Sequence, residues 1–203
     1  FIVAEAGNNH EGNFSVAKKL VKKAAESGAD AIKFQTFKTD YFINKSEKKR
    51  YKQLEKFKLE MEQFKELNRI AKKNKIIFFS TPLDLYSAKE LNKFQKIFKI
   101  SSGDNNYFDM LKLVLSFNKP TIISTGMTNL KLKKQIYFFL KKNSKSKLSS
   151  KNIGLLHCVS SYPTPFSEAN LSSINLMKKI FNDVTVGYSD HTIGMEACIA
   201  AAS

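Results

Sequence analysis

Residues 31–36 read Ala-Ile-Lys-Phe-Gln-Thr, and this hexapeptide sets the expectation for the fold. β-Branched and aromatic residues favour a strand, and side chains along a strand point alternately to its two faces. Ile32 and Phe34 would therefore share one face, and Lys33 and Gln35 the other. We expect the apolar pair to pack against helices. We expect the lysine and the glutamine to point to the inside of a closed sheet, where charged side chains often mark a functional site.

Similar runs recur along the whole chain. Their starts are about 31 residues apart on average, the length of one βα unit, and amphipathic helical stretches lie between them. Nearly every run ends in polar residues, whereas an open doubly wound sheet would gather them mainly at one switch point. In a barrel, every strand ends at the active-site face. We therefore predict an α/β fold, a (βα)₈ TIM barrel, with strands at Phe1–Gly7, Ala31–Thr36, Ile76–Pro82, Ile97–Gly103, Pro120–Met127, Asn152–Ser160 and Thr185–Asp190.

The barrel is expected to be incomplete. Such barrels have about 250 residues, and the chain has 203. We therefore expect residues 1–203 to be an incomplete TIM-barrel catalytic domain, truncated after about seven strands. The chain starts with Phe1 rather than Met, and residues 195–203 read as an unfinished helix, which suggests a fragment. Such a fragment would expose strand edges, so we expect it to be poorly soluble or inactive alone.

Helices are indicated by apolar residues that recur every three or four positions. The clearest stripes run through residues 16–25, which stop at Gly28, and through residues 61–71 and 132–140. Two segments are interpreted as irregular: Lys38–Lys58, which is long and basic, and Asn143–Lys151, which reads as a solvated loop. Shorter helices fit the segments Ser87–Phe94, Asp109–Phe117 and Ser172–Phe181.

The charge balance raises the question of a nucleic-acid partner. There are 34 Lys and Arg residues against 18 Asp and Glu, a formal net charge of +16, and basic surfaces attract polyanions. Only Arg50 and Arg69 are arginine, however, and the lysines are spread over nearly every amphipathic stretch. This pattern favours a solvated lysine-rich surface. No apolar run is long enough for a membrane span. Two cysteines and the lack of a signal peptide favour the cytoplasm.

Lysines near the ends of two strands are the first candidates for chemistry. Lys99 repeats the pattern of Lys33, since Phe98 and Ile100 lie on its opposite face. Two inward lysines repel each other unless an anion lies between them, and the serines and glycines that follow the strands are typical of phosphate sites. A Schiff-base lysine and a lysine that reaches solvent are the alternatives. The hydroxyls concerned are those of Ser101, Ser102, Ser124, Thr125 and Ser189.

Three further residues have more than one interpretation. Glu5 could be a general base, an anchor for a substrate hydroxyl, or an ion-pair partner for Lys33. His191 could be a metal ligand or an acid–base group, although a lone histidine is more often structural and metal sites usually need three or more ligands. Cys158 is interpreted as a small buried residue with no obvious base beside it.

The chain resembles the sialic acid synthase family, which comprises N-acetylneuraminate synthase and related nonulosonic acid synthases. The resemblance covers essentially the whole chain and rests on seven motifs that occur in this order: FIVAEAGNNHEGN, AIKFQTF, FFSTPLD, FKISSGDNN, IISTGM, LLHCVSSYPTP and VGYSDHTIG. It implies a (βα)₈ barrel followed by a small antifreeze-protein-like domain. That domain and strand eight are absent from residues 1–203.

The resemblance implies an enzyme that condenses phosphoenolpyruvate with an open-chain N-acylated aldose. The aldose would be N-acetylmannosamine or a related diacetamido sugar, and the products a nine-carbon 2-keto sugar acid and phosphate. A divalent metal ion, Mn²⁺ or Mg²⁺, would polarise the sugar aldehyde. A homodimer is implied for the full-length protein, without a specific nucleic-acid partner or a membrane.

The resemblance also implies roles for single residues. Lys33 and Lys99 match lysines that bind phosphoenolpyruvate, and Glu5 matches an acidic residue near the reacting carbonyl of the sugar. His191 matches the first of two metal-binding histidines. We therefore expect Glu5, Lys33 and His191 to be catalytic. The substrate-binding residues would be Gln35, Thr81, Lys99, Ser102, Ser124, Ser160, Tyr162 and Ser189.

Ser160 departs from the family pattern, because asparagine is often found at this position in sialic acid synthases proper. This departure weakens N-acetylmannosamine as the specific sugar. The second metal-binding histidine and a nearby glutamate would belong to strand eight, beyond Ser203. The alternatives are a 3-deoxy sugar acid phosphate synthase, which the basic segment Lys38–Lys58 does not exclude, a Schiff-base aldolase that uses Lys33 or Lys99, and a nucleic-acid-binding protein.

Overall fold

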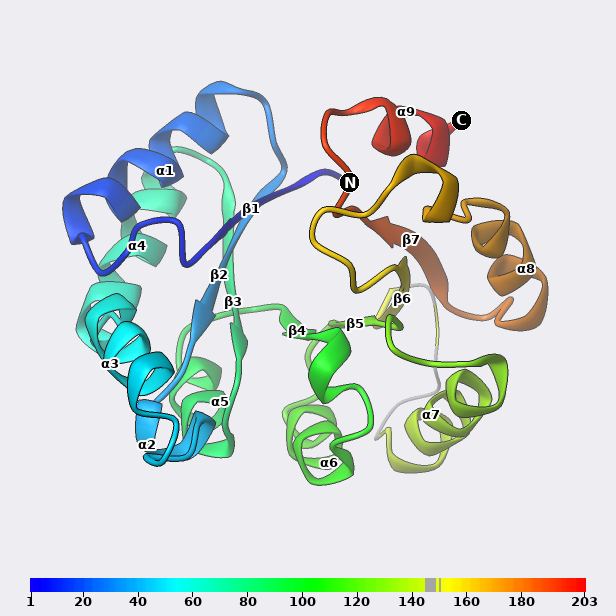
Figure 1. The fold of residues 1–203 in the computed structure, drawn as a ribbon, viewed down its shortest axis with the longest axis horizontal. Helices are drawn as coiled ribbons and strands as arrows, with labels where there is room; N and C mark the ends of the chain where they lie inside the picture. Colours follow the sequence, from blue (N-terminus) through cyan, green and yellow to red (C-terminus); the bar gives the residue numbers. More distant parts are fainter. Residues whose placement is uncertain (145–148, 150) are drawn as a thin grey trace. The chain divides into compact units, whose positions relative to one another are not determined.

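The computed structural model describes residues 1–144, 149 and 151–203. It divides into two compact units, Phe1–Phe98 (unit 1) and Lys99–Ser203 (unit 2). In each unit, β-strands alternate along the chain with α-helices (Figure 1). The expected α/β class with parallel sheets is therefore confirmed.

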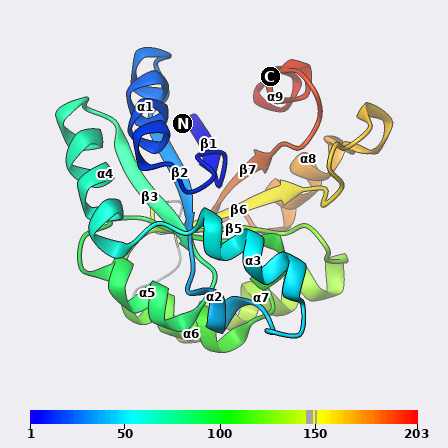
Figure 2. The ribbon, with the colours of Figure 1, turned by 60° about the vertical axis from the view of Figure 1, so that its left-hand side comes forward.

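Unit 1 contains a parallel sheet in the order β1–β2–β3. Helices α1 and α4 contact each other and pack against this sheet (Figure 2). Asn13 caps α1 by accepting a hydrogen bond from the Val16 amide, and Asp84 caps α5 by accepting one from Ser87. The elements are β1 (Val3–Gly7), α1 (Phe14–Glu26), β2 (Ala31–Thr36), α2 (Thr39–Phe42), α3 (Lys48–Phe57), α4 (Met61–Lys73), β3 (Ile77–Pro82) and α5 (Leu85–Asn92).

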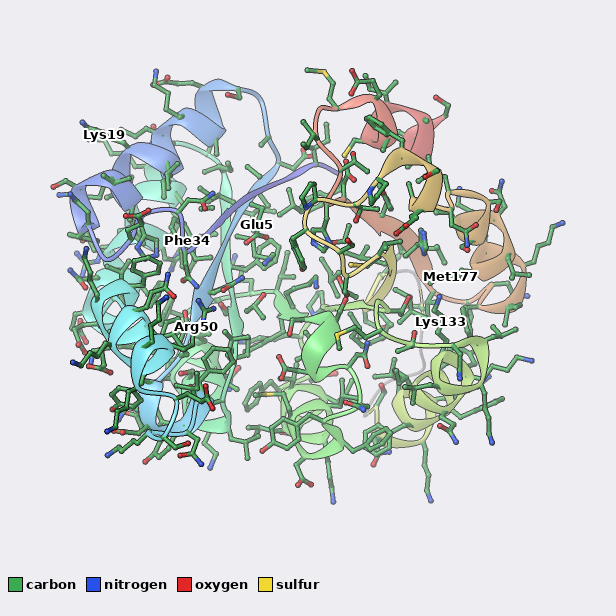
Figure 3. All side chains as sticks on the ribbon, viewed as in Figure 1. Glu5, Lys19, Phe34, Arg50, Lys133 and Met177 are labelled. Carbon is green, nitrogen blue, oxygen red and sulfur yellow. The ribbon has the colours of Figure 1, made fainter. Side chains whose placement is uncertain are left out.

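The core of unit 1 lies between the sheet and the helices. Phe34 is fully buried and contacts the rings of Phe64 on α4 and Phe78 on β3, with centroid distances of 6.5 and 5.7 Å. Figure 3 shows Phe34 on the helix side of β2 and Glu5 on the other side of the strands. The expected alternation of residues 31–36 is therefore confirmed, and Lys33 and Gln35 lie on the face away from this core.

Unit 2 contains a second sheet, in the order β4–β5–β6–β7, and β5, β6 and β7 pair in parallel. A 3₁₀ turn, Ser102–Asp104, follows β4, and Ser102 is its first residue. Helices α6 and α7 contact each other, and α8 packs against β6 and β7. The elements are β4 (Phe98–Ile100), α6 (Phe108–Ser116), β5 (Thr121–Ser124), α7 (Leu130–Asn143), β6 (Ile153–Cys158), α8 (Ser172–Ile180), β7 (Thr185–Ser189) and α9 (Glu196–Ala202).

The segment Lys38–Lys58, expected to be irregular, is largely helical, and that expectation was wrong. It forms α2 and α3. Leu54 on α3 is buried, and the hydroxyl of Tyr51 on α3 donates to Asp40 on α2 at 2.7 Å. The abundance of lysine masked the helix in the sequence, because a single buried leucine leaves little apolar periodicity.

Some strands end earlier than the sequence suggested. The run Ile97–Gly103 pairs only through Ile100, because Ser102–Asp104 form the 3₁₀ turn and the Ser101 hydroxyl bonds the Asp104 carboxylate. In Asn143–Lys151, residue 143 still belongs to α7, and residues 145–148 and 150 lie outside the described residues. Among the described residues, no helix has the length and apolar character that a membrane crossing requires.

Candidate functional site

The candidate residues of unit 1 gather at the ends of its three strands, and we call them the Glu5 cluster: Glu5, Asn8, Lys33, Gln35 and Thr81. Glu5 and Lys33 are register partners on β1 and β2. The Lys33 ammonium lies 2.6 Å from Glu5 Oε2 and donates to Thr81 Oγ1 at 3.3 Å. The Lys33 side chain is only 13% exposed, so the alternative of a lysine that reaches solvent is wrong. Its ion pair with Glu5 is confirmed.

Gln35 is bonded by one neighbour, Asn8, and given room beside Glu5 by another, Gly7. The side-chain amide of Asn8 donates to Gln35 Oε1 at 2.8 Å. Gly7 has a φ of 49°, in the left-handed region, and a Cβ atom at this position would lie 3.1 Å from Glu5 Oε1 and 3.8 Å from Gln35 Nε2. Glycine thus lets the backbone turn sharply while both polar side chains approach it.

The candidate residues of unit 2 form a second group, the Lys99 cluster: Lys99, Ser102, Ser124, Gly126 and Ser160. Lys99 is 6% exposed, and its ammonium donates to Ser124 Oγ at 2.6 Å and to the carbonyl of Ile100 at 2.9 Å. Ser124, which ends β5, is also buried. A buried ammonium beside a hydroxyl is a typical arrangement for holding a phosphate or carboxylate group.

Hydroxyl groups converge on Gly126 from two directions. The Gly126 amide donates to Ser102 Oγ at 3.1 Å. A Cβ atom at Gly126 would lie 2.5 Å from Ser160 Oγ and 2.7 Å from Ser102 Oγ. Among the described residues, Ser160 Oγ is a buried oxygen without a hydrogen-bond partner. A buried polar atom of this kind indicates a position where a ligand or water completes the bonding.

Asn105 supports this turn and was missed in the sequence. It is 2% exposed, and its side-chain amide donates to the carbonyls of Ser124 and Gly126 at 3.2 and 2.9 Å. These bonds hold the backbone after β5 in place. The quoted motif FKISSGDNN contains Asn105, but only the fold shows that its side chain reaches the next strand.

His191 follows β7, and its surroundings fix its tautomer. Nδ1 lies 2.6 Å from the carbonyl oxygen of Val159, which can only accept, so Nδ1 carries the proton and Nε2 has the lone pair. The ring of Tyr162 lies against the imidazole at a centroid distance of 4.1 Å. The neighbouring Cys158 raises the pKa of His191, against an opposing effect of burial.

Cys158 is buried as expected, and His191 lies beside it. The ring atom nearest the thiol is Nδ1, which carries the proton, so it can donate to the sulfur but cannot act as its base. The Sγ of Cys158 lies 3.9 Å from His191 Nδ1, and Cys158 pairs in register with Ser189. Burial acts to raise the pKa of the thiol, but bonds from His191, Ser102 and Ser189 outweigh it and lower the pKa. The sequence pattern predicted that Cys158 lies on a strand, now β6. It could not show that His191, in the turn after β7, lies beside this cysteine.

Asp190 holds the turn that carries His191. Its carboxylate accepts from Tyr188 Oη, from the amide and hydroxyl of Thr192, and from Cys198 Sγ, at 2.8–3.2 Å. Burial opposes ionisation, but these donors lower the pKa of Asp190 overall. Since its bonds are made within the turn and to α9, Asp190 has a structural role here.

His191 was expected to be a metal ligand. Its Nε2 is a suitable neutral nitrogen ligand. In the described part of the chain, however, no three His, Cys, Asp or Glu side chains lie close enough to hold a metal ion. The described residues alone therefore do not complete a metal site.

The predicted residues are thus brought together within their own units. Glu5, Lys33, Gln35 and Thr81 meet in unit 1, and Lys99, Ser102, Ser124 and Ser160 in unit 2. Ser189 and Tyr162 lie beside the Cys158–His191 pair, with Tyr162 74% exposed. The catalytic and substrate-binding roles expected for these residues stay predictions.

The NeuB family model matches residues 20–203. The chain is 43% identical over 214 residues to N,N'-diacetyllegionaminic acid synthase of Campylobacter jejuni, covering 98% of this chain and 63% of that protein. It is 33% identical to N-acetylneuraminate-9-phosphate synthase of Mus musculus, covering 99% and 58%.

Among solved structures, the chain resembles the N-acetylneuraminic acid synthetase of Leptospira borgpetersenii with a TM-score of 0.88 and 32% identity. This match covers 99% of this chain and 68% of that one. The chain spans about 60% of the length of the two curated relatives. The match to the family model extends over most of the sequence, and the motifs identified above agree with it. The chain belongs to the NeuB family.

Proposed function

We propose that the protein condenses phosphoenolpyruvate with an unphosphorylated N-acylated aldose to form a 2-keto sugar acid and phosphate. The Lys99 cluster is the observation that carries this proposal. A buried ammonium, serine hydroxyls and a backbone amide are the groups that bind a phosphorylated carboxylic acid. The relatives from Campylobacter jejuni and Mus musculus, a legionaminic acid synthase and a neuraminate-9-phosphate synthase by name, support the same reaction class.

In the proposed reaction, C3 of phosphoenolpyruvate attacks the aldehyde carbon of the open-chain sugar. Water adds at C2, and the tetrahedral intermediate loses phosphate by cleavage of its C–O bond. One phosphoenolpyruvate, one aldose and one water thus give one sugar acid and one phosphate. Lys99, Ser124 and Ser102 would hold the phosphorylated substrate, with Ser189 as a further hydroxyl, and a positive charge there favours the build-up of negative charge on the leaving phosphate.

The Glu5 cluster would bind the sugar. Glu5 is half exposed, so its carboxylate is available to a hydroxyl group while Lys33 fixes its orientation. The Lys33 ammonium is engaged by the Glu5 carboxylate and by the Thr81 hydroxyl. Gln35 and Thr81 supply further hydrogen bonds. Tyr162 is exposed and lies against His191, and its ring offers an aromatic face to the open-chain sugar.

A divalent metal ion, Mn²⁺ or Mg²⁺, would supply Lewis-acid polarisation of the aldehyde when bound. His191 Nε2 is a nitrogen that could contribute one ligand, and the described residues alone do not supply the rest. The homodimer and the cytoplasmic location expected from the sequence stay predictions.

The test is phosphate release from phosphoenolpyruvate by the full-length protein. The panel contains N-acetylmannosamine, a 2,4-diacetamido-trideoxyhexose and phosphorylated aldoses, with Mn²⁺ or with a chelator. We expect release with an unphosphorylated N-acylated sugar. Release only with a phosphorylated N-acylated aldose would instead indicate an N-acetylneuraminate-9-phosphate synthase like the mouse relative. Release only with a sugar phosphate that has no N-acyl group would indicate a 3-deoxy sugar acid phosphate synthase, and no release with any sugar would refute the proposal. The preferred sugar would also show what serine at position 160 selects.

A further inference from the structure

Asn8 fixes which end of the Gln35 side chain is available to a ligand. A carboxamide has an acceptor end and a donor end. Asn8 Nδ2 donates to Gln35 Oε1 at 2.8 Å, so the oxygen of Gln35 is already engaged. The end of Gln35 that remains for a substrate is therefore its Nε2 amide, a hydrogen-bond donor.

This donor lies next to an acceptor. Gln35 Nε2 and Glu5 Oε1 are 3.8 and 3.1 Å from the place where a Cβ of Gly7 would be, so both groups border the same side of Gly7. The second oxygen of Glu5 is held by Lys33 at 2.6 Å. Donor and acceptor thus border the same point beside Gly7, and the other polar atom of each side chain is engaged, by Asn8 in Gln35 and by Lys33 in Glu5.

A sugar hydroxyl is the group that matches such a pair. It donates one hydrogen bond and accepts others, so it can donate to the Glu5 carboxylate and accept from the Gln35 amide. If Gln35 were turned over, two acceptor oxygens would face a hydroxyl that has only one proton. One hydrogen bond would then be lost and an acceptor left unsatisfied.

We propose that Asn8 is a positioning residue that fixes the orientation of the Gln35 carboxamide, so that Gln35 and Glu5 together bind one hydroxyl group of the aldose. This inference rests on the proposed function. It adds that Gln35 donates a hydrogen bond to the sugar hydroxyl and that Glu5 accepts one from it. Asn8 itself does not touch the sugar.

The kinetic test compares Asn8→Asp with the full-length wild type in the phosphate-release assay. Aspartate cannot donate to Gln35 Oε1 but accepts from Nε2, so Gln35 turns over. We expect the KM for the aldose to rise about 10-fold, and the KM for phosphoenolpyruvate to stay within twofold. Asn9→Asp is the matched control, because it adds the same charge one residue along on an exposed side chain. Equal KM values for the aldose in the two variants would overturn the proposal.

A second readout does not depend on catalysis. In the wild type labelled at its glutamine side chains, we expect nuclear Overhauser effects between the Gln35 amide protons and Gly7 Hα, and their loss in Asn8→Asp. Their absence from the wild type would overturn the proposal. If they are present but no aldose supports turnover, the proposed function fails while the orientation of Gln35 stands. If turnover is normal but they are absent, only the role of Asn8 fails.

Discussion

Replacement of Gly126 by alanine tests whether the hydroxyls of the Lys99 cluster bind phosphoenolpyruvate. The added methyl carbon would lie 2.5 Å from Ser160 Oγ, 2.7 Å from Ser102 Oγ and 3.1 Å from Ser102 Cβ. Ordinary contact begins at 3.4 Å, so the two oxygens must move by roughly 0.7–0.9 Å. Each oxygen can do so by rotating about χ1, and Ser102 Cβ needs a shift of only a few tenths of an ångström. We therefore expect unfolding to become easier by only about 1 kcal/mol, the low end for overpacking.

The effect on binding should be larger than the effect on folding. A hydrogen bond from a hydroxyl to a charged group contributes about 1.5–3 kcal/mol. Loss of one such bond to the phosphate corresponds to a rise in the KM for phosphoenolpyruvate of about 10- to 150-fold. The KM for the aldose should change little. Steady-state phosphate release and urea unfolding of the same full-length samples measure the two effects.

Gly103→Ala is the matched control for this substitution. Gly103 lies in the turn after β4, next to Ser102, and a Cβ atom there meets nothing within 4 Å. We expect Gly103→Ala to leave the KM for phosphoenolpyruvate and the free energy of unfolding close to those of the wild type. If Gly126→Ala behaves like Gly103→Ala in both assays, the reasoning that assigns the phosphate to these hydroxyls is refuted.

Two predictions concern folding. Burial is the main cause that lowers the pKa of His157 below its ordinary value of 6.5, so the neutral ring stabilises the fold above that value and this contribution is lost as the pH falls below it. Urea unfolding at pH 7.5 and pH 5.0 should show a larger loss in the wild type than in His157→Gln, and equal losses would contradict this. Phe34→Ala, which removes a fully buried ring, should cost about 3–5 kcal/mol of unfolding free energy. Phe138→Ala, which removes a ring that is 62% exposed, should cost less than about 0.5 kcal/mol. Similar losses of unfolding free energy in the Phe34 and Phe138 variants would show that Phe34 does not lie in the core.

The parts of the fold that follow a short-range pattern were predictable. Alternation in residues 31–36 placed Phe34 in the core and Lys33 and Gln35 on the opposite face, and strand spacing gave the α/β class. Helix α3 was missed because its burial depends on one leucine among lysines. The ends of β4 and β5 were misjudged because local turns, at Ser102–Asp104 and at Met127 with a φ of 58°, interrupt the pairing.

The candidate site was predictable in its residue types but not in its contacts. The pairing of Lys33 with Glu5 was one of the open alternatives. It could be foreseen because both residues lie on predicted neighbouring strands, whose side chains can meet on one face. The contacts of Asn105 with the turn after β5 and of His191 with Cys158 join segments more than 20 residues apart. No periodicity encodes such contacts, because they depend on strand order and on how each turn closes. Asn8 was overlooked for the same reason, although it stands in a quoted motif.

Oxygen labelling tests the proposed condensation most directly. The full-length protein is given phosphoenolpyruvate whose bridging C–O–P oxygen is ¹⁸O, with and without the best N-acylated aldose. Condensation with cleavage of the C–O bond predicts that the label appears in the released phosphate, and only when the aldose is present. Label that stays in the keto acid would mean cleavage of the P–O bond. That result, or release of labelled phosphate without any sugar, would contradict the account.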